Sequence, residues 1–482
     1  MQTIDGRARR RPSLALLGVV GALGATGVVL ASATVGSIPR PHSYRWWLRL
    51  PGLSYDAGHV LFYAALALLT LAWIGVGVHA RAGRLSVRAA GALLVAWGTP
   101  LLVGAPVFSR DVYSYVADGV LARRGFNPYL ASPHLLAGGP LYASIAEVWR
   151  HSPSPYGPLF QLAARLTAVL AGHSLMVQVV AFRALELLGV AALVAVLPRL
   201  ARHYHVDPGL ALWLGVLSPL ALFSAISSAH NDTLMLGLMG VGLLLMSRDH
   251  RVGAAALFAL AATVKLPAIA GLVVLYAGPW WRTGAGARVR LAFEAVVVTG
   301  AVLAGATGLA GDGWRWLSPH ALAIPTELHV LITPVVSVGV LVASLLHAAG
   351  DHQATRAVVT ATQHVGEALA VLGIVVVVVR TRAQNTVRTL GVSLLILVWL
   401  SPTVWPWYFL WGLTALAVTR AQRSAFLAAT AGAAMLLVGP GGTPMIGGNG
   451  YLVAGPLLVG AAGWFVGSGR WRGVLAGADR GD

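Results

Sequence analysis

One short segment of the sequence combines side chains that can move a proton and bind a polar ligand. The segment SRDVYSYVADG, residues 109–119, follows a long apolar run in a chain with only 16 acidic residues among 482. Its carboxylates Asp111 and Asp118 lie seven residues apart with Tyr115 between them, and offsets of four and seven share one face of a helix. Because a charge directly after an apolar span is costly, Asp111 is a candidate functional carboxylate.

A structural role for these carboxylates competes with this interpretation. Either one can cap a helix or pair with a nearby basic side chain, namely Arg110, Arg123 or Arg124. Asp118 suits the structural role better than Asp111, because no apolar span directly precedes it.

A lysine in the second half of the chain is a candidate phosphate ligand. Of the 34 lysines and arginines, Lys265 alone is a lysine. It lies in VKLP, residues 264–267, where we expect two short helices to meet, and helix N-termini favour anions. A lysine near a helix end can instead extend to the lipid headgroups, so both interpretations stay open.

Three further motifs interrupt apolar segments with groups that suit a sugar. They are SPYGP at 154–158, HND at 230–232 and SPTVWPWY at 401–408. Aromatic faces stack on sugar rings, but Trp405, Trp407 and Tyr408 can equally belong to the aromatic belt of a membrane interface. Asn231 or Asp232 can cap a helix, and SPYGP can be a turn whose last proline begins one.

The composition restricts the class of protein. Hydrophobic residues make up 57% of the chain and charged residues 10%, against about 25% charged in an average soluble domain. Long uninterrupted apolar runs indicate a polytopic helical membrane protein, and a β-barrel would show short alternating segments instead. The net charge of +18 comes from arginines grouped between apolar runs, which is typical of membrane topology and not of nucleic-acid binding.

The arginine groups also predict the topology. They place both chain ends in the cytoplasm, with an uncleaved first span at 14–36. Apolar runs that alternate across the membrane predict an all-α bundle of about fourteen transmembrane helices. The segment 252–281 is expected to form the two short helices that meet at VKLP, and 330–348 a re-entrant or outer-leaflet segment. All of the motifs above then lie on the outer face.

We expect a single membrane domain over residues 1–482. A first outer loop at 108–173 would carry short juxtamembrane helices, and a second outer or re-entrant region would occupy 311–362. The chain has no cysteine, which excludes disulfides and thiolate metal sites. It also lacks a Walker A loop and a G-x-G-x-x-G motif, which argues against ATP-driven transport.

Together these motifs carry a resemblance to a known family. The outer loop opens with S-R-D-V-Y-S-Y, continues to R-R-G-F-N-P-Y and closes with S-P-Y-G-P-L, and A-H-N-D-T-L-M-L-G-L and V-K-L-P follow. Over about residues 105–411 the chain resembles the C-type multispanning glycosyltransferases, in particular the actinobacterial polyprenol-phosphate-mannose-dependent α-1,6-mannosyltransferases. In that family the first outer loop supplies an essential acidic residue, which corresponds to Asp111, and outer basic and aromatic residues correspond to Lys265 and Trp405 to Tyr408.

The resemblance implies a reaction at the outer face of the cell membrane. Mannose would pass from polyprenyl-phosphate-mannose to a mannose 6-hydroxyl of a lipid-anchored mannan, with inversion of the anomeric centre. Asp111 would be the general base, and Lys265 and Arg110 would bind the donor phosphate. The remaining candidates would contact sugar or acceptor: Tyr113, Tyr115, Asp118, Tyr156, His230, Asn231, Asp232, Trp405, Trp407 and Tyr408. No cofactor or metal ligand is predicted, and the need for a divalent metal stays open.

Two alternatives remain at this point. A related enzyme could use another lipid-phosphate sugar such as arabinofuranose, which sequence motifs separate poorly. A secondary transporter or lipid flippase is the alternative from another class. Such proteins often contain inverted repeats and charged residues at mid-membrane, whereas this chain shows no internal repeat and its polar motifs gather at one face.

Overall fold

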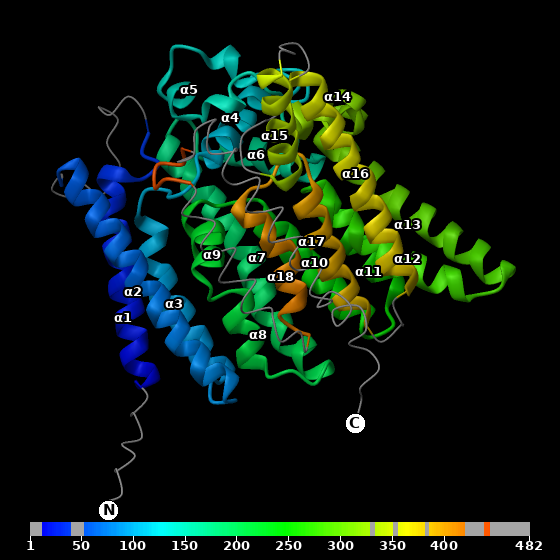
Figure 1. Cartoon of the computed structure of the whole chain (residues 1–482), viewed down its shortest axis with the longest axis horizontal. Coiled ribbons are helices and arrows are strands. Elements are labelled where there is room, and N and C mark those ends of the chain that lie inside the picture. Colours follow the sequence, from blue (N-terminus) through cyan, green and yellow to red (C-terminus); the bar gives the residue numbers. More distant parts are fainter. Residues whose placement is uncertain are drawn as a thin grey trace, which may run out of the picture.

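The computed structural model describes residues 12–39, 53–327, 333–349, 355–380, 385–419 and 438–443 (Figure 1). Every regular element in these ranges is a helix, which confirms the predicted all-α class. The first ten α-helices are α1 (Leu14–Val35), α2 (Tyr55–Arg81), α3 (Val87–Val103), α4 (Asp111–Arg123), α5 (Pro140–Ser144), α6 (Pro158–Leu170), α7 (Leu175–His203), α8 (Pro208–Gly215), α9 (Pro219–Leu222) and α10 (Asp232–Met246).

The second half of the chain continues the helical bundle. Its α-helices are α11 (Arg251–Ala262), α12 (Ile269–Arg282), α13 (Ala285–Ala310), α14 (Pro319–Glu327), α15 (Pro334–Ala348), α16 (Thr355–Arg380), α17 (Thr386–Leu400) and α18 (Phe409–Leu416). Short 3-10 or π turns link them: η1 (Pro133–Leu136), η2 (Glu147–Trp149), η3 (Phe223–Ser227), η4 (Leu266–Ala268), η5 (Gly313–Leu317) and η7 (Pro406–Tyr408).

Helix length and composition identify a membrane protein. Among the described residues, five helices are long and apolar enough to cross a membrane, namely α1, α2, α7, α13 and α16, and α8 with the segment Pro219–Ser227 adds a sixth if that pair, bent by 58°, is one span. Six further apolar helices have 10–17 residues. The count of about fourteen spans stays a prediction, and most of its last two spans, 424–439 and 450–467, lies outside the described residues.

Serine residues determine where the first helices begin. The hydroxyls of Ser13, Ser54 and Ser86 each accept a hydrogen bond from the backbone N–H three residues on, at 3.1–3.3 Å, at the starts of α1, α2 and α3. Such a cap satisfies a backbone donor that the helix itself leaves unpaired. α1 packs against both α2 and α3, and the three helices lie at one edge of the molecule (Figure 1).

The predicted pair of short helices around VKLP is confirmed. α11 ends at Ala262, Lys265 has an extended backbone, and η4 leads into α12. The first-loop segment also contains the expected short helices α4, α5 and α6, which lie at one end of the molecule with α14 and α15 (Figure 1). The segment predicted to be re-entrant forms the helix α15, which packs on α16.

Small residues let the helices around this end approach closely. A Cβ at Gly119 of α4 would lie 2.2 Å from the carbonyl oxygen of Ala164 in α6, and one at Gly237 of α10 would lie 2.7 Å from the Cα of Gly189 in α7. Close contact between backbones is a usual source of stability for helices in membranes. It brings the helix ends that carry the polar motifs within side-chain reach of one another.

Candidate active site

The five polar motifs predicted to share a site are in direct contact. Asp111 Oδ2 lies 3.5 Å from His230 Nδ1, and Lys265 Nζ lies 2.9 and 3.0 Å from the two carboxylate oxygens of Asp232. His230 stacks on Trp407 with ring centroids 3.9 Å apart. We call the group Asp111, Trp149, Tyr156, His230, Asp232, Lys265, Trp407, Tyr408 and Trp411 the polar cluster.

Asp111 is the first residue of α4 and is almost fully buried. Its backbone N–H donates to Ser109 Oγ at 3.1 Å, and its Oδ1 accepts a hydrogen bond from Trp149 Nε1 at 3.0 Å. Burial raises the pKa of Asp111 to about 6, while Lys265 and the Trp149 hydrogen bond act in the opposite direction. A carboxylate with such a pKa is still ionised at neutral pH and is a stronger base than an ordinary one.

His230 is the imidazole that faces this carboxylate. It is 1% exposed, and its backbone N–H donates to the carbonyl of Ser224 at 2.9 Å. Burial, with Lys265 as a second cause, holds the pKa of His230 well below its usual value. The ring is therefore neutral at neutral pH, with one nitrogen a donor and the other an acceptor.

Left-handed backbone precedes both of these residues. Phe108 has φ 66° three positions before Asp111, and Ala229 has φ 52° directly before His230. Residues other than glycine rarely adopt this conformation, which costs about 1–3 kcal/mol and is found most often at functional sites. The strain therefore coincides with the two side chains that meet in the polar cluster.

Lys265 and Asp232 form a nearly buried ion pair inside an aromatic cage. Their side chains are 12% and 1% exposed. The ammonium nitrogen lies 4.5 Å from the ring centre of Tyr408 and 5.4 Å from that of Trp411, and Trp411 Nε1 also donates to Asp232 Oδ1. Tyr156 completes the cage at 5.9 Å. A cation held this way is desolvated and oriented before any ligand arrives.

The turn that carries Tyr156 is attached directly to the VKLP segment. The backbone N–H of Gly157 donates to the carbonyl of Val264 at 3.1 Å, and that of Leu159 donates to Thr263 at 3.0 Å. A Cβ at Gly157 would lie 2.2 Å from the oxygen of Thr263, so no larger residue fits there. The first-loop motif and Lys265 are thus held in register by backbone contacts.

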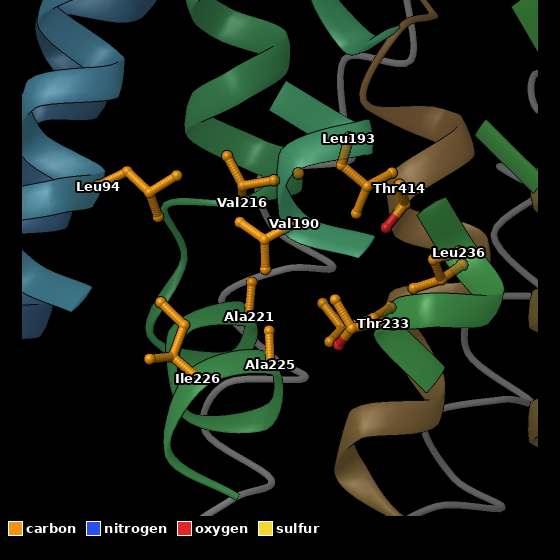
Figure 2. A pocket seen from close by; sticks show the side chains of 12 residues that line it. Leu94, Val190, Leu193, Val216, Ala221, Ala225, Ile226, Thr233, Leu236 and Thr414 are labelled. Atoms are coloured by element: carbon orange, nitrogen blue, oxygen red, sulfur yellow. The ribbon is translucent and has the colours of Figure 1, made fainter. Parts of the chain in front are cut away.

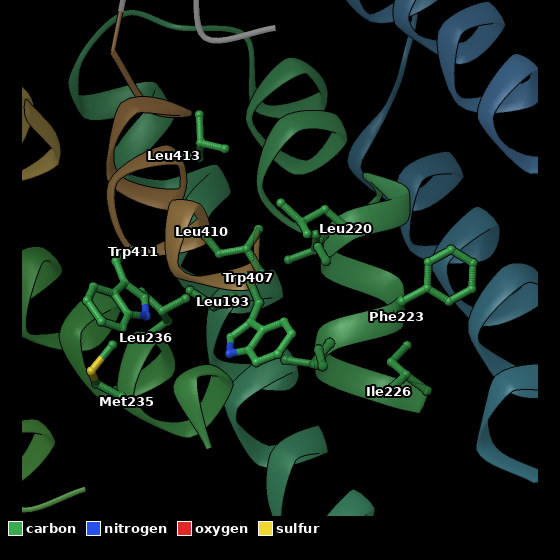
Figure 3. Close-up of a cluster of buried hydrophobic side chains, with 14 of the residues drawn as sticks. Leu193, Leu220, Phe223, Ile226, Met235, Leu236, Trp407, Leu410, Trp411 and Leu413 are labelled. Carbon is green, nitrogen blue, oxygen red and sulfur yellow. The ribbon is translucent and has the colours of Figure 1, made fainter. Parts of the chain in front are cut away.

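The aromatic residues near the C-terminal end of the described chain form a stacked column. Trp405 stacks on Trp407 at 4.9 Å, and Trp407 in turn stacks on His230. Figure 3 shows Trp411 of α18 beside Leu236 and Met235, and Trp407 of η7 in the same cluster of buried apolar side chains. Both indoles are therefore buried within the protein and do not form an exposed membrane belt.

Several buried polar atoms of this region have no hydrogen-bond partner among the described residues. They are Nδ1 of His230, both amide atoms of Asn231 and Nε1 of Trp405. A buried polar group without a partner is costly and rare. A polar ligand in the site would supply the missing partners.

Three predicted site residues make other contacts. Arg110 donates to the carbonyls of Ile38 and Ser144 at 3.1 Å and of Gly441 at 3.0 Å, which joins three backbone segments behind Asp111. Tyr113 Oη donates to the carbonyl of Ser37 at 2.5 Å. Tyr115 meets Tyr156 edge to face at 5.2 Å. Neighbouring tyrosines on α4 thus point toward different surroundings.

Asp118 belongs to a separate buried group on the α6 side of α4. Its Oδ2 accepts a hydrogen bond from Gln161 Nε2 at 3.2 Å, and Gln161 also contacts Ser154 Oγ. Burial raises the pKa of Asp118 to about 7, against the effect of the hydrogen bonds from Ser154 and Gln161. This carboxyl links α4, α6 and the turn before α6.

Sequence reasoning missed several residues that support the site. Trp149 and Trp411 each donate to a carboxylate of the polar cluster. Trp411 lies three positions after Tyr408, a helical spacing that could have revealed it. Trp149 lies 38 positions from Asp111, and no local pattern indicates that pairing.

A pair of polar residues in α7 holds the backbone beneath the site. Arg183 donates to the carbonyls of Leu102, Gly104 and Ser227, and Glu186 accepts from the N–H of Leu234 at 2.8 Å. These contacts join the end of α3, the turn before His230 and the first turn of α10. Buried polar groups inside a spanning helix are expensive, and here they fix the segments that carry Asp111 and His230.

An apolar pocket lies next to the polar cluster. Residues of α3, α7, α8, α9, η3, α10 and α18 line it, among them Leu94, Val190, Ile226, Thr233 and Leu410 (Figure 2). Thr233 directly follows Asp232, so the pocket and the ion pair adjoin. Within the described residues, no group of three or more histidine, cysteine, aspartate or glutamate side chains is arranged to hold a metal ion.

Comparison with known proteins relates this geometry to an enzyme family. Residues 18–283 match the family model described as alpha-(1→6)-mannopyranosyltransferase, N-terminal domain, and residues 333–466 match the MptB C-terminal domain. No solved structure matches the chain significantly.

Curated relatives agree with the family models. Alpha-(1→6)-mannopyranosyltransferase A of Mycobacterium tuberculosis is 32% identical over 89% of this chain and 82% of its own length. A probable alpha-(1→6)-mannopyranosyltransferase of Mycolicibacterium smegmatis is 31% identical over 86% and 81%, and alpha-(1→6)-mannopyranosyltransferase B of Corynebacterium glutamicum is 29% identical over 85% and 73%. The chain is therefore a membrane mannosyltransferase that belongs to the alpha-(1→6)-mannopyranosyltransferase family.

Proposed function

We propose that the enzyme transfers mannose from polyprenyl-phosphate-mannose to a mannose 6-hydroxyl of a lipid-anchored α-1,6-mannan, with inversion of the anomeric centre. The observation that carries this proposal is the buried carboxylate of Asp111. It lies near the ammonium group of Lys265 and near buried polar atoms of His230 and Asn231 that have no hydrogen-bond partner among the described residues. A hydroxyl acceptor needs the carboxylate, a phosphate leaving group needs the cation, and a sugar satisfies the remaining groups.

The chemical step is a direct displacement. Asp111 takes the proton of the acceptor hydroxyl. At the same time the hydroxyl oxygen of the acceptor forms a bond to the anomeric carbon of the donor mannose. The bond from that carbon to the phosphate oxygen breaks, and polyprenyl phosphate leaves with the electron pair. The transition state resembles an oxocarbenium ion, as in other glycosyl transfers that use a carboxylate. A β-linked donor then yields an α-linked product.

The departing phosphate needs charge stabilisation more than a proton. Lys265 is the first candidate for this role, because the cage orients its ammonium group. Arg110 is the second candidate, although its Nε and Nη1 already donate to three backbone carbonyls. We place the sugars against Tyr156, His230, Asn231, Asp232 and the Trp405–Tyr408 column.

The outer end of α4 and the apolar tail of the donor complete the proposal. Tyr115 lines the sugar region beside Tyr156, whereas Tyr113 and Asp118 support the fold of α4 through their contacts with Ser37 and Gln161. The apolar tail of the donor would lie between helices in the lipid. Mannose is preferred over arabinofuranose because the relatives are named as mannopyranosyltransferases, and membership of an enzyme family argues against the transporter alternative.

The reaction can be tested with the purified protein in lipid vesicles. Radiolabelled polyprenyl-phosphate-mannose and an α-1,6-dimannoside should yield a labelled trimannoside whose new linkage an α-1,6-specific mannosidase cleaves. Vesicles with the Asp111→Asn variant are the control for enzyme-dependent transfer. Labelled product from GDP-mannose, with none from the lipid donor, would contradict the proposed donor.

The proposed outer location of the site has its own test. The chain has no cysteine, so single cysteines give labelling without background. Ala137→Cys in the first loop and His250→Cys before α11 are both exposed positions. An impermeant thiol reagent added to intact cells should label the first and not the second. Labelling of His250→Cys alone would invert the topology and reject an outer site.

A further inference from the structure

The two oxygens of the Asp111 carboxylate have different surroundings. Oδ1 accepts the indole N–H of Trp149 at 3.0 Å, and Trp149 is itself 7% exposed. An indole nitrogen can only donate, so this contact requires Oδ1 to act as an acceptor. It stabilises the ionised carboxylate and fixes the rotation of its plane.

The second oxygen faces a group that has no hydrogen bond. Oδ2 lies 3.5 Å from His230 Nδ1, and that nitrogen is buried without a hydrogen-bond partner among the described residues. Two atoms this far apart can both lie within about 2.8 Å of one hydroxyl oxygen. A hydroxyl placed there can donate to Oδ2 and accept from Nδ1–H, so Oδ2 is the oxygen open to an acceptor.

We propose that Trp149 is a positioning residue that occupies Oδ1 of Asp111 and thereby leaves Oδ2, opposite His230, to take the acceptor proton. The inference rests on the proposed role of Asp111 as general base. It adds which oxygen reacts and which residue selects it. Trp149 does not touch the reacting atoms in this arrangement and acts through Asp111.

The segment that carries Trp149 is firmly attached to the site. Arg110 donates to the carbonyl of Ser144 at 3.1 Å, and Arg150 donates to that of Ala143 at 3.3 Å. The first bond holds the end of α5 against the start of α4, and the second holds the end of η2 against α5. The indole therefore has a fixed position relative to Asp111, as a positioning role requires.

Removal of the indole N–H should change the titration of the base. A hydrogen bond to the ionised form lowers a carboxyl pKa, so its loss raises the pKa of Asp111. The acid limb, which is the fall of kcat/KM as the pH is lowered, then moves to higher pH. The other titratable or charged groups that face Asp111 from the surrounding elements are Tyr115, Tyr156, His230, Asp232, Lys265 and Tyr408. None of them is altered by a substitution at Trp149.

The test is Trp149→Phe, which keeps an aromatic ring and removes the donor. We expect kcat to fall by roughly 10- to 100-fold, as for loss of one hydrogen bond to a charged group, and the acid limb to rise by roughly one pH unit. The matched control is Trp97→Phe, since Trp97 is also buried and donates at 3.0 Å to the carbonyl of Gly18, between α3 and α1. Its kcat and acid limb should not change.

The outcomes separate this inference from the proposed function. If Asp111→Asn is inactive while Trp149→Phe has normal kcat and an unmoved acid limb, the base stands and the role of Trp149 is wrong. If Asp111→Asn is active, the proposed base itself fails. If Trp149→Phe does not fold, Trp149→Gln replaces it in the test. Because glutamine keeps an N–H donor, its acid limb must stay at the pH of the native enzyme. Loss of rate without movement of the limb, or failure of both variants to fold, would overturn the inference.

Discussion

Asp111→Asn should lower kcat by about 10²–10⁴-fold, the usual contribution of general-base catalysis. Asparagine keeps the shape of the side chain and an oxygen for the Trp149 hydrogen bond but cannot take a proton. The donor should still bind, because Asp111 acts on the acceptor. Single-turnover measurements with the lipid donor bound in advance would show this loss in the chemical step.

The pH dependence of the native enzyme provides a second readout of the same residue. Burial raises the pKa of Asp111 to about 6. Since the ionised form is the base, kcat/KM should be constant above that pH and fall as the pH drops through about 6. The variant should lose this limb together with most of its activity.

Asp118→Asn is the matched control for this experiment. Asp118 lies on the same helix and is equally buried, but its pKa of about 7 keeps much of it protonated at neutral pH, and asparagine resembles the protonated acid. Its activity per molecule should fall less than that of Asp111→Asn. Near-normal turnover of a well-expressed Asp111→Asn protein would reject the mechanism, and a reversed order of the two variants would make Asp118 the base.

Lys265→Ala should weaken use of the lipid donor by roughly 10- to 100-fold, the cost of one charge-assisted hydrogen bond to phosphate. The structure adds a complication, because the substitution also leaves Asp232 buried without its cation. Breaking such a pair typically costs about 3–5 kcal/mol of stability. Loss of activity alone would therefore not identify a phosphate ligand.

A double substitution separates the two effects. Lys265→Met combined with Asp232→Asn removes both charges at similar volume and should recover most of the thermal stability lost in Lys265→Ala. If Lys265 binds the donor phosphate, the double variant should remain defective in donor use. Asp232→Asn alone keeps the ammonium group and should use the donor better than the double variant. Normal donor kinetics in the double variant would assign Lys265 to the ion pair only.

Much of the site could be predicted because its residues lie at interruptions of apolar segments. Asp111 directly follows an apolar run, and VKLP divides an apolar stretch too long for one span, so both had to lie near helix ends. Two halves of that stretch became α11 and α12, with Lys265 between them. The predicted face of Asp111, Tyr115 and Asp118 lies on one helix, α4.

The partners of these residues could not be predicted in the same way. Tyr113 bonds to Ser37 on the α1 side, Tyr115 meets Tyr156, and Asp118 bonds to Gln161 of α6. Local spacing places Tyr115 and Asp118 on one face of α4 and Tyr113 on another. It contains no information about which neighbouring helix each face meets.

The sequence by itself determined the helical membrane class, the polar helix ends and the chemistry that they offer, because apolar length and charge placement act locally along the chain. Only the tertiary structure decided that Lys265 is paired with Asp232 and that Trp149 holds Asp111. These contacts join positions 33 and 38 residues apart, and they depend on how closely glycine-lined helices approach and at what angle they cross. That geometry is set by packing across the whole bundle, so no segment contains it alone.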